Sequence, residues 1–226
     1  MPRVAVLMPV RNAERTVRAA AASILRQTER DLALVAVDDG SADGTADVLT
    51  RLAERDRRVV LVGGPGEGIA RALNRGLARC DAELVARMDA DDVAHPQRLA
   101  LQRAALAADP ALVAVGARVR LFPRRVVRAG MVRYAAWLNG LTTKELVARD
   151  LFVEAPIVHP AATIRRGALE RAGGWRDGDF PEDYDLWLRL AAAGGALTNL
   201  PQPLLDWRES AARATRTDPR YALERH

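Results

Sequence analysis

The stretch Leu84-Val85-Ala86-Arg87-Met88-Asp89-Ala90-Asp91-Asp92 joins a β-like apolar run to a cluster of carboxylates. Residues 84–88 read as a buried strand, and Asp89 and Asp91 follow at alternate positions just beyond it. Carboxylate oxygens suit hard cations such as Mg²⁺ and Mn²⁺, and Mg²⁺ leaves most of its coordination positions for water and substrate phosphates. The stretch therefore predicts a strand whose carboxyl end holds a metal ion against a diphosphate.

Short apolar runs alternate with helical patterns throughout the first half of the chain. The expected strands cover residues 4–10, 32–37, 59–62 and 84–88, and the expected helices cover residues 14–26, 47–55, 68–79 and 96–108. Strands that are apolar throughout are typical of a parallel sheet covered by helices on both faces. The first half therefore predicts an α/β fold that binds ligands beyond the carboxyl ends of its strands.

The second half has a different composition and a less regular pattern. Its expected strands cover residues 113–120 and 161–165, and its expected helices cover residues 131–138, 142–150 and 183–193. All ten aromatic residues lie between Phe122 and Tyr221. We therefore expect one domain of 226 residues with two functional halves, residues 1–120 and residues 121–226.

Polar side chains follow three of the expected strands. Residues 9–12 follow the first strand, residues 38–39 follow the second, and the carboxylates of residues 89–92 follow the fourth. Because carboxyl ends of parallel strands share one edge, we expect these groups to meet there. A carboxylate at residues 38–39 can accept hydrogen bonds from a nucleobase or ribose, whereas Ser41 and Asp43 are interpreted as caps of the next helix.

Three familiar ligand-binding motifs are excluded by spacing or context. Residues 39–44 resemble the start of a calcium loop, but its twelfth position is Thr50 and a strand precedes it in place of a helix. The glycines of residues 63–68 follow the third strand without the spacing of a dinucleotide fingerprint, so they predict a permissive turn beside the ligand. Lys144 is the only lysine, which excludes a P-loop.

The carboxylate cluster also has a simpler interpretation, as a helix-capping turn before Pro96. That interpretation accounts for Asp92. It does not account for Asp89 and Asp91, because three carboxylates within four residues repel one another unless a cation neutralises them. The position at a strand end therefore favours a metal site over a cap.

Residues 181–189 open a helix that carries ionisable groups on two faces. Asp183 shares a face with apolar side chains, so we expect a partly desolvated carboxylate suited to a general base; the alternative is stabilisation of the helix dipole. Asp185 and Arg189 are interpreted as a surface ion pair. For His159, contact with an acceptor or metal and a structural hydrogen bond are both open.

Basic residues are concentrated in the middle of the chain. The net charge is +5, the isoelectric point is about 10.2, and residues 110–144 contain no acidic residue. The basic residues of this segment are Arg118, Arg120, Arg124, Arg125, Arg128, Arg133 and Lys144. Nucleic acid, an anionic membrane face and a phosphate-bearing acceptor all fit this charge, and a solvated arginine-rich surface explains it equally well.

Cysteine content and hydropathy indicate the cellular setting. Cys80 has no second cysteine with which to form an internal disulfide, and no apolar run approaches the roughly 20 residues of a membrane-spanning helix. The run at residues 4–8 is too short for the core of a secretory signal. We expect a reducing, cytoplasmic setting, with peripheral attachment to the inner membrane face as an alternative.

Together, the motifs resemble those of family 2 glycosyltransferases. They are VLMPVRN at residues 6–12, VDDGS at 37–41, residues 68–76 with Asn74, MDADD at 88–92, EDY at 182–184, IVHP at 157–160, GGW at 173–175 and WR at 207–208. The resemblance covers about residues 3–208. It implies the GT-A fold, an α/β fold whose Rossmann-like, mostly parallel sheet is flanked by helices. It also implies a donor-binding half followed by an α+β acceptor-side C-terminal half.

The resemblance also assigns roles to individual residues. The residues implied to bind the nucleotide sugar are Pro9, Val10, Arg11, Asn12, Asp39, Gly68, Arg71 and Asp89. Asp91, together with Asp89, is implied to ligate Mg²⁺ or Mn²⁺ at the diphosphate, and Asp183 is implied to be the catalytic base of an inverting single displacement. Candidates for the acceptor side are His159, Glu182, Trp187 and Arg208; for Trp187, packing in the core is the alternative.

The resulting prediction is an enzyme that moves a sugar from a nucleoside-diphosphate sugar, with a UDP-sugar favoured, to a hydroxyl acceptor. The acceptor is expected to be a glycan, a polysaccharide or a lipid-linked molecule, with peripheral membrane contact through residues 118–133. Leu73 stands where many relatives have arginine, so Arg71 or Arg75 is expected to compensate. The Gln-x-x-Arg-Trp element of processive synthases is absent, which favours single transfers.

Two alternative functions remain open. A sugar-nucleotide nucleotidyltransferase also uses an α/β half and a metal, but residues 9–12 are not the Gly-rich, arginine-containing loop expected after its first strand. An arginine-rich nucleic-acid-binding protein fits the isoelectric point but leaves the carboxylate cluster unexplained. We therefore expect no nucleic-acid partner.

Overall fold

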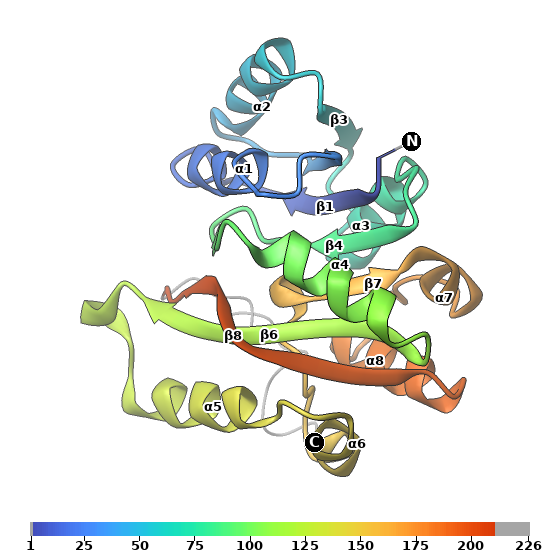
Figure 1. The fold of residues 1–226 in the computed structure, drawn as a ribbon. Helices are drawn as coiled ribbons and strands as arrows, with labels where there is room; N and C mark the ends of the chain where they lie inside the picture. The colour runs from blue at the N-terminus through green and yellow to red at the C-terminus, as the bar shows by residue number, and fades with distance from the viewer. Residues whose placement is uncertain (1, 211–226) are drawn as a thin grey trace.

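The structure is a computed structural model that describes residues 2–210, and these residues form one curled sheet with helices on both faces (Figure 1). The strand order is β3-β2-β1-β4-β7-β6-β8-β5. The strands are β1 (Val4–Val10), β2 (Leu32–Asp39), β3 (Val59–Gly64), β4 (Leu84–Arg87), β5 (Val93–Ala94), β6 (Leu112–Phe122), β7 (Thr163–Arg165) and β8 (Ala196–Arg208). Residues 211–226 of the predicted acceptor half lie outside the described residues.

Eight α-helices and two short 3₁₀ turns are found within residues 2–210. The helices are α1 (Val17–Leu25), α2 (Thr45–Arg55), α3 (Ile69–Leu77), α4 (Arg98–Ala108), α5 (Ala129–Gly140), α6 (Lys144–Asp150), α7 (Arg166–Arg171) and α8 (Glu182–Ala192). The 3₁₀ turns are η1 (Arg124–Val126) and η2 (His159–Ala161). In this part of the chain, no helix has both the length and the apolar composition needed to cross a membrane.

The central strand β1 explains why the first half reads as continuous apolar runs. It pairs in parallel with β2 on one side and β4 on the other. Its alternate side chains enter two cores: Val6 and Met8 pack with residues of α1, α2 and α4, whereas Ala5 and Leu7 pack with residues of α3, α7 and α8. Both faces of the strand are therefore buried, and the predicted parallel sheet between two helical layers is confirmed.

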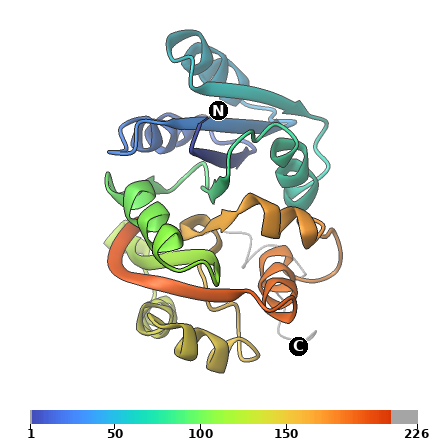
Figure 2. The same cartoon turned by 45° about the vertical axis from the view of Figure 1, so that its right-hand side comes forward.

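The second half completes the same sheet with mixed strand directions. β7 runs antiparallel to both β4 and β6, while β6 and β8 lie side by side in parallel. The strand β8 was not expected, because Pro201 and Pro203 interrupt the pattern of residues 196–208. It forms nevertheless along the length of β6, with register shifts near the prolines, and it curves across the molecule after α8 (Figure 2).

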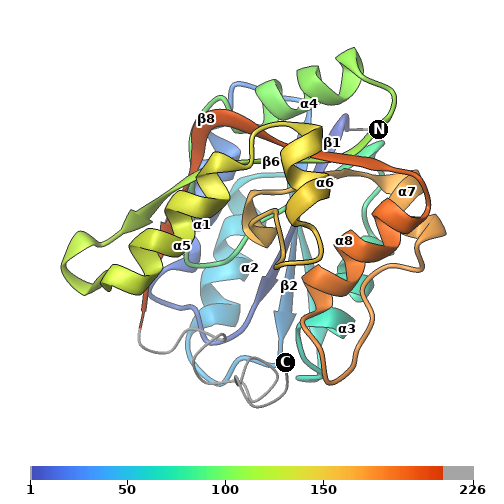
Figure 3. The ribbon, with the colours of Figure 1, turned by 90° about the horizontal axis from the view of Figure 1, so that it is seen from below.

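The helices α5, α6 and α8 cover one side of the mixed part of the sheet (Figure 3). The start of α5, together with η1 and the end of β6, projects from the body of the molecule (Figure 3). Residues of α5 and α8 line a cavity that also contains the carboxylates after β4.

Close packing of α3 against the sheet gives a test of the fold. A Cβ atom at Gly76 would overlap Leu7 Cδ1 and lie 2.6 Å from Val37 Cγ2, and both side chains are fully buried. We expect Gly76→Ala to destabilise the protein by about 1–3 kcal/mol, the cost of overpacking a core. Gly130 in α5 has no neighbour within 4 Å of such an atom, so Gly130→Ala should be neutral or stabilising. Denaturant unfolding of both variants measures the contrast, and equal effects would contradict the packing described.

Candidate active site

The loops that follow β1, β2 and β3 are tied together at the carboxyl edge of the sheet. Asn12, whose φ is 51°, donates its backbone N–H to Ser41 Oγ at 2.9 Å and accepts the Ala42 N–H on its Oδ1 at 2.8 Å. Ser41 also donates to Asp38 Oδ1 at 2.6 Å. Ser41 therefore joins two loops and does not cap α2, contrary to the prediction, whereas Asp43 does accept the Thr45 N–H at the start of that helix.

The carboxylate of Asp39 organises the glycine-rich turn. Asp39 is 4% exposed, and it accepts backbone N–H groups from Gly66 and Glu67 on Oδ1 and from Gly68 on Oδ2, at 2.8–3.1 Å. Gly66 and Gly68 have φ values of 91° and 95°, which favour glycine. The predicted permissive turn is present, and Asp39 fixes it next to the end of β2.

The predicted diphosphate contacts of α3 are engaged in ion pairs. Arg71 Nε lies 2.9 Å from Asp177 Oδ2, and Arg75 Nη2 lies 2.5 Å from Glu67 Oε2. Leu73 is fully buried. A diphosphate would therefore have to draw either arginine away from an existing carboxylate partner.

The carboxylates after β4 converge as a cluster of three. One oxygen from each of Asp89, Asp91 and Asp92 can be chosen so that all three lie within 4.8 Å of one another. Asp92 is 1% exposed; its Oδ1 accepts the Arg208 N–H at 2.7 Å, and its buried Oδ2 has no hydrogen-bond partner among the described residues. Asp92 is therefore a member of the cluster and more than the turn residue that the sequence suggested.

The electrostatics of the cluster favour a cation. Burial raises the pKa of Asp91 to about 6, and the Asp89 charge adds to the rise. Burial, followed by the charges of Asp89 and Asp91, raises the pKa of Asp92 well above its usual value. A divalent ion would neutralise the repulsion between the three carboxylates and could bind the buried Asp92 Oδ2, so this donor set fits Mg²⁺ or Mn²⁺.

Two buried arginines surround the end of β4, and neither was singled out from the sequence. Arg98 is fully buried and donates to the backbone oxygens of Arg87 and Ala162 at 2.6 and 3.2 Å, so it fixes the end of the strand. Arg87 is 3% exposed and pairs through Nη1 with Asp89. For Arg87, the available signal in the sequence was a charged residue within an otherwise apolar strand pattern.

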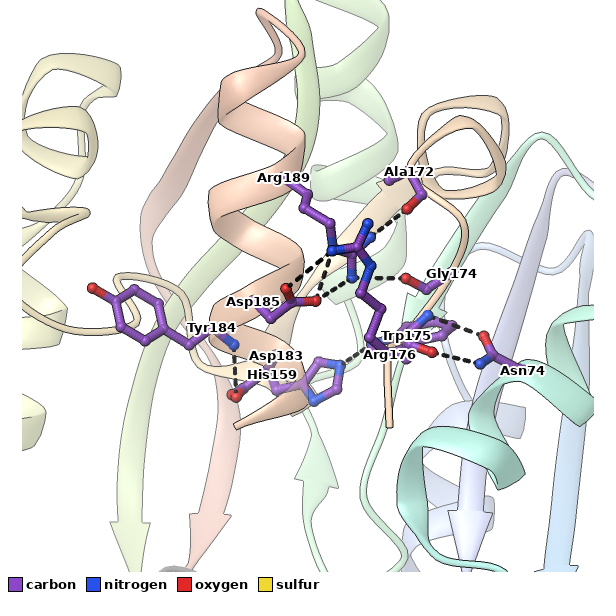
Figure 4. Close-up of polar contacts among 10 residues, drawn as sticks. All are labelled: Asn74, His159, Ala172, Gly174, Trp175, Arg176, Asp183, Tyr184, Asp185 and Arg189. Carbon is purple, nitrogen blue, oxygen red and sulfur yellow. Dashed lines mark hydrogen bonds and ion pairs between the residues drawn. The ribbon is translucent and has the colours of Figure 1, made fainter. Parts of the chain in front are cut away.

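Asp183 lies in the first turn of α8. It is half-buried, and its Oδ1 accepts the Tyr184 N–H at 2.9 Å (Figure 4). Burial raises the pKa of Asp183 to about 7, and the neighbouring Glu182 charge contributes. The predicted desolvation is thus present, and a carboxyl that titrates near neutrality suits a general base.

His159 is held in one orientation beneath Asp183. Its Nε2 accepts the Trp175 Nε1–H at 2.9 Å (Figure 4), and its Nδ1 lies 3.7 Å from Glu182 Oε1. Burial lowers the pKa of His159 well below its usual value, so the ring is neutral and carries its proton on Nδ1. Of the two interpretations left open, the structural hydrogen bond is present.

One cavity of about 520 Å³ joins the carboxylate cluster to Asp183. Arg87, Glu182, His159 and Arg208 line it, as do apolar residues of α5 such as Met131. Its size is that of a small-molecule site. A second, more open cavity of about 440 Å³ contains Gly68 and shares Ile69 with the first.

The predicted site residues separate into three groups. Asp89, Asp91, Asp183, His159, Glu182 and Arg208 line the main cavity. Pro9 and Val10 end β1, Asp39 ends β2, and Arg71 lies in α3, while Arg11, Asn12 and Gly68 lie on loops; none of these residues lines that cavity. Trp187 is fully buried in the core next to the His159 ring, so the structure assigns it to packing and not to direct contact with an acceptor.

The ion pair of Asp185 and Arg189 is less exposed than predicted. Arg189 Nη2 lies 2.6 Å from Asp185 Oδ2, with side-chain exposures of 14% and 20%. The guanidinium also donates to the backbone oxygens of Ala172 and Gly174 (Figure 4). Arg189 thus anchors the loop that carries Trp175, whose backbone is also held by Asn74 (Figure 4).

Comparison with known proteins agrees with this geometry. Residues 5–173 match the family model of glycosyl transferase family 2. The chain belongs to glycosyl transferase family 2. Among curated family 2 relatives, the glycosyltransferase EpsE of Bacillus subtilis strain 168 is 28% identical, with 99% of this chain and 79% of that protein covered. The amylovoran biosynthesis glycosyltransferase AmsE of Erwinia amylovora is 31% identical, with 81% and 66% covered.

A solved structure confirms the GT-A fold of this family 2 glycosyltransferase. The mannosyltransferase PcManGT from Pyrobaculum calidifontis, in complex with GDP-Man and Mn²⁺, superposes with a TM-score of 0.72 at 26% sequence identity. The match covers 94% of this chain but 58% of PcManGT. The chain therefore spans about three fifths of that protein and about two thirds of AmsE.

Proposed function

We propose that this family 2 glycosyltransferase transfers a sugar from a nucleoside-diphosphate sugar to an acceptor hydroxyl, with inversion at the anomeric carbon. The observation that carries the proposal is the single cavity that joins the Asp89–Asp91–Asp92 cluster to Asp183. Carboxylates that can bind a metal ion and a desolvated carboxyl in one cavity are what leaving-group departure and hydroxyl attack require. The complex of PcManGT with GDP-Man and Mn²⁺ supports a nucleotide-sugar donor and a divalent metal ion.

The donor is proposed to lie along the carboxyl edge of the sheet. Residues 9–12, Arg11 included, and the turn held by Asp39 would border the nucleoside, and Arg71 would reach the diphosphate by leaving Asp177. Asp89 and Asp91, joined by Asp92, would hold Mg²⁺ or Mn²⁺, which when bound neutralises charge on the departing diphosphate. Residues 1–120 would thus supply the donor side.

Asp183 is proposed to act as the general base. Its carboxylate takes the proton of the acceptor hydroxyl as the hydroxyl oxygen bonds to the anomeric carbon. The bond from that carbon to the diphosphate oxygen breaks, and its electron pair leaves with the nucleoside diphosphate. Glu182, His159 and Arg208 line the acceptor side, within the half formed by residues 121–226.

The direct test is turnover with a panel of nucleoside-diphosphate sugars in the presence of Mn²⁺, with UDP-sugars and GDP-mannose included. We expect metal-dependent release of nucleoside diphosphate from at least one donor, and a product of inverted anomeric configuration by NMR. A nucleotidyltransferase would instead release pyrophosphate from a nucleoside triphosphate and a sugar phosphate, which would contradict the proposal.

We also propose that the acceptor is a glycan or is lipid-linked, and that residues 118–133 contact an anionic membrane. Arg124, Arg125 and Arg128 are exposed, and none has an ion-pair partner within residues 2–210. Val126 and Val132 of the same segment are 43% and 52% exposed. Exposed valines among unpaired arginines fit a lipid surface better than they fit nucleic acid, which favours aromatic platforms for its bases.

Vesicle binding tests the membrane contact. Each basic residue near an anionic surface contributes about 1 kcal/mol, so replacing Arg124, Arg125 and Arg128 with glutamine should weaken binding to phosphatidylglycerol vesicles by up to about 100-fold. The matched control replaces three exposed arginines, Arg51, Arg55 and Arg57, near α2 at the other end of the molecule (Figure 1). Equal losses in the two variants would indicate attraction by net charge alone, and oligonucleotide binding that depends on the first set would favour nucleic acid.

A further inference from the structure

Arg87 is a buried cation on the wall of the cavity that holds both groups of carboxylates. It ends β4, its side chain is 3% exposed, and its Nη1 pairs with Asp89. Its Nε is buried without a hydrogen-bond partner among the described residues. Burying a guanidinium that leaves one N–H donor without a partner costs free energy of folding unless its positive charge stabilises a neighbouring group.

The charge of Arg87 also acts on Asp183. Both residues line the same cavity. Burial raises the pKa of Asp183 and the Glu182 charge raises it further, while Arg87 acts in the opposite direction. The guanidinium therefore favours the ionised form of this carboxyl.

The backbone of Arg87 is fixed without help from its side chain. Its carbonyl accepts Arg98 Nη2 at 2.6 Å, and its N–H donates to the Ala162 oxygen at 2.8 Å. Neighbouring Met88 donates its N–H to the Leu7 oxygen at 3.0 Å. Replacing the guanidinium should therefore change the charge in the cavity while leaving the strand in place.

We propose that Arg87 is a positioning residue for the transfer reaction: it holds Asp89 in place before the metal ion binds, and it keeps a positive charge in the cavity that Asp183 also lines. This inference rests on the function proposed above. It leads to an unusual combination of effects, because the guanidinium and a divalent cation compete for the same Asp89 carboxylate. Removing Arg87 should strengthen binding of the cation and weaken turnover.

Calorimetric titration with Mn²⁺ alone, at pH 8, tests the first effect. We expect Arg87→Met to bind Mn²⁺ about two- to fivefold more tightly than the wild type, the scale of a partly exposed charge pair. Arg87→Lys keeps the charge and should stay close to the wild type. Arg103→Met, which removes an arginine that pairs with Glu29 outside the cavity, is the matched control and should not alter Mn²⁺ affinity.

The pH dependence of kcat/KM tests the second effect. Besides Arg87, the charged or titratable groups that line the cavity with Asp183 are Glu182, His159, Glu154, Tyr134, Arg208 and the cluster Asp89, Asp91 and Asp92. These groups are unchanged in Arg87→Met. The acidic limb of its kcat/KM profile should therefore move to higher pH because the guanidinium is lost, and Arg87→Lys should return the limb to its wild-type position. If Arg87 only supported the fold, its replacement would not both tighten Mn²⁺ binding and move the acidic limb to higher pH.

The outcomes separate this role from the proposed function. Unchanged or weaker Mn²⁺ binding by Arg87→Met, or an acidic limb that does not move, would overturn the role of Arg87 while the wild type still binds Mn²⁺ and turns over. A wild type that binds no Mn²⁺ and releases no nucleoside diphosphate would overturn the proposed function and this role with it. Tighter Mn²⁺ binding with a shifted acidic limb supports the role.

Discussion

Asp183→Asn is expected to lower turnover by about 10²- to 10⁴-fold while leaving binding of the nucleotide-sugar donor close to that of the wild type. The amide cannot take the acceptor proton, and general-base assistance is typically worth about this factor. The change leaves in place Asp89, Asp91 and Asp92, which are the proposed metal ligands. Single-turnover assays with donor binding measured in parallel separate the two quantities.

The wild-type pH profile provides a second readout for Asp183. Burial, with the Glu182 charge, raises the pKa of Asp183 to about 7, and only the ionised carboxylate can accept a proton. Activity should therefore fall as the pH drops through about 7, and the remaining activity of Asp183→Asn should lose this limb. The control is Asp81→Asn, which alters an exposed carboxylate outside the cavity. Near-wild-type transfer by Asp183→Asn would refute the assignment of the base.

Asp91→Asn is expected to abolish most of the Mn²⁺-dependent binding of the donor. Losing an outer-shell partner of a metal already costs about 10- to 100-fold in metal affinity or activity, and loss of a direct ligand should cost at least as much. Calorimetry with Mn²⁺, and then with nucleoside diphosphate in the presence of Mn²⁺, measures both steps. Asp81→Asn again serves as the control.

The thermal stability of Asp91→Asn distinguishes the loss of a metal ligand from a folding defect, because a folding defect would lower the Tm of the metal-free protein. Burial, with the Asp89 charge, raises the pKa of Asp91 to about 6, above its unfolded value of 3.8. A group whose pKa rises on folding contributes stability at low pH that is lost as the pH climbs through the folded value, so ionised Asp91 destabilises the metal-free protein at pH 8. The Tm of metal-free Asp91→Asn should therefore equal or exceed that of the wild type, and Mn²⁺ should no longer raise it. A large fall in Tm without metal would show instead that Asp91 is structural.

The fold was predictable wherever a strand is buried on both faces. β1, β2 and β4 read as strands because helices cover both sides of them, and alternating directions of β1 side chains fill both cores. β8 was not predictable, because Pro201 and Pro203 oppose a strand locally and pairing along β6 overrides them. Long-range pairing of this kind leaves no pattern within the segment itself.

The positions of the site residues were predictable from the sequence, whereas the burial of their side chains was less so. A strand ending in carboxylates located the cluster, and helical spacing located Asp183, but neither pattern reports how far a side chain is buried. Asp92 resembled a cap until its enclosed oxygen placed it in the cluster. For Trp187, core packing and an acceptor contact were both open, and the structure buries it fully in the core. Arg87 carries no motif, because its proposed role depends partly on Asp183, which lies 96 residues further along the chain.

Calorimetric titration of the wild-type protein with a panel of nucleoside diphosphates, with and without Mn²⁺, tests the central claim most directly. The donor site proposed at the carboxyl edge of the sheet requires a metal ion at Asp89, Asp91 and Asp92 to hold the diphosphate. We expect at least one member of the panel to bind with an affinity that depends on Mn²⁺. Absence of metal-dependent binding for every member would contradict the account.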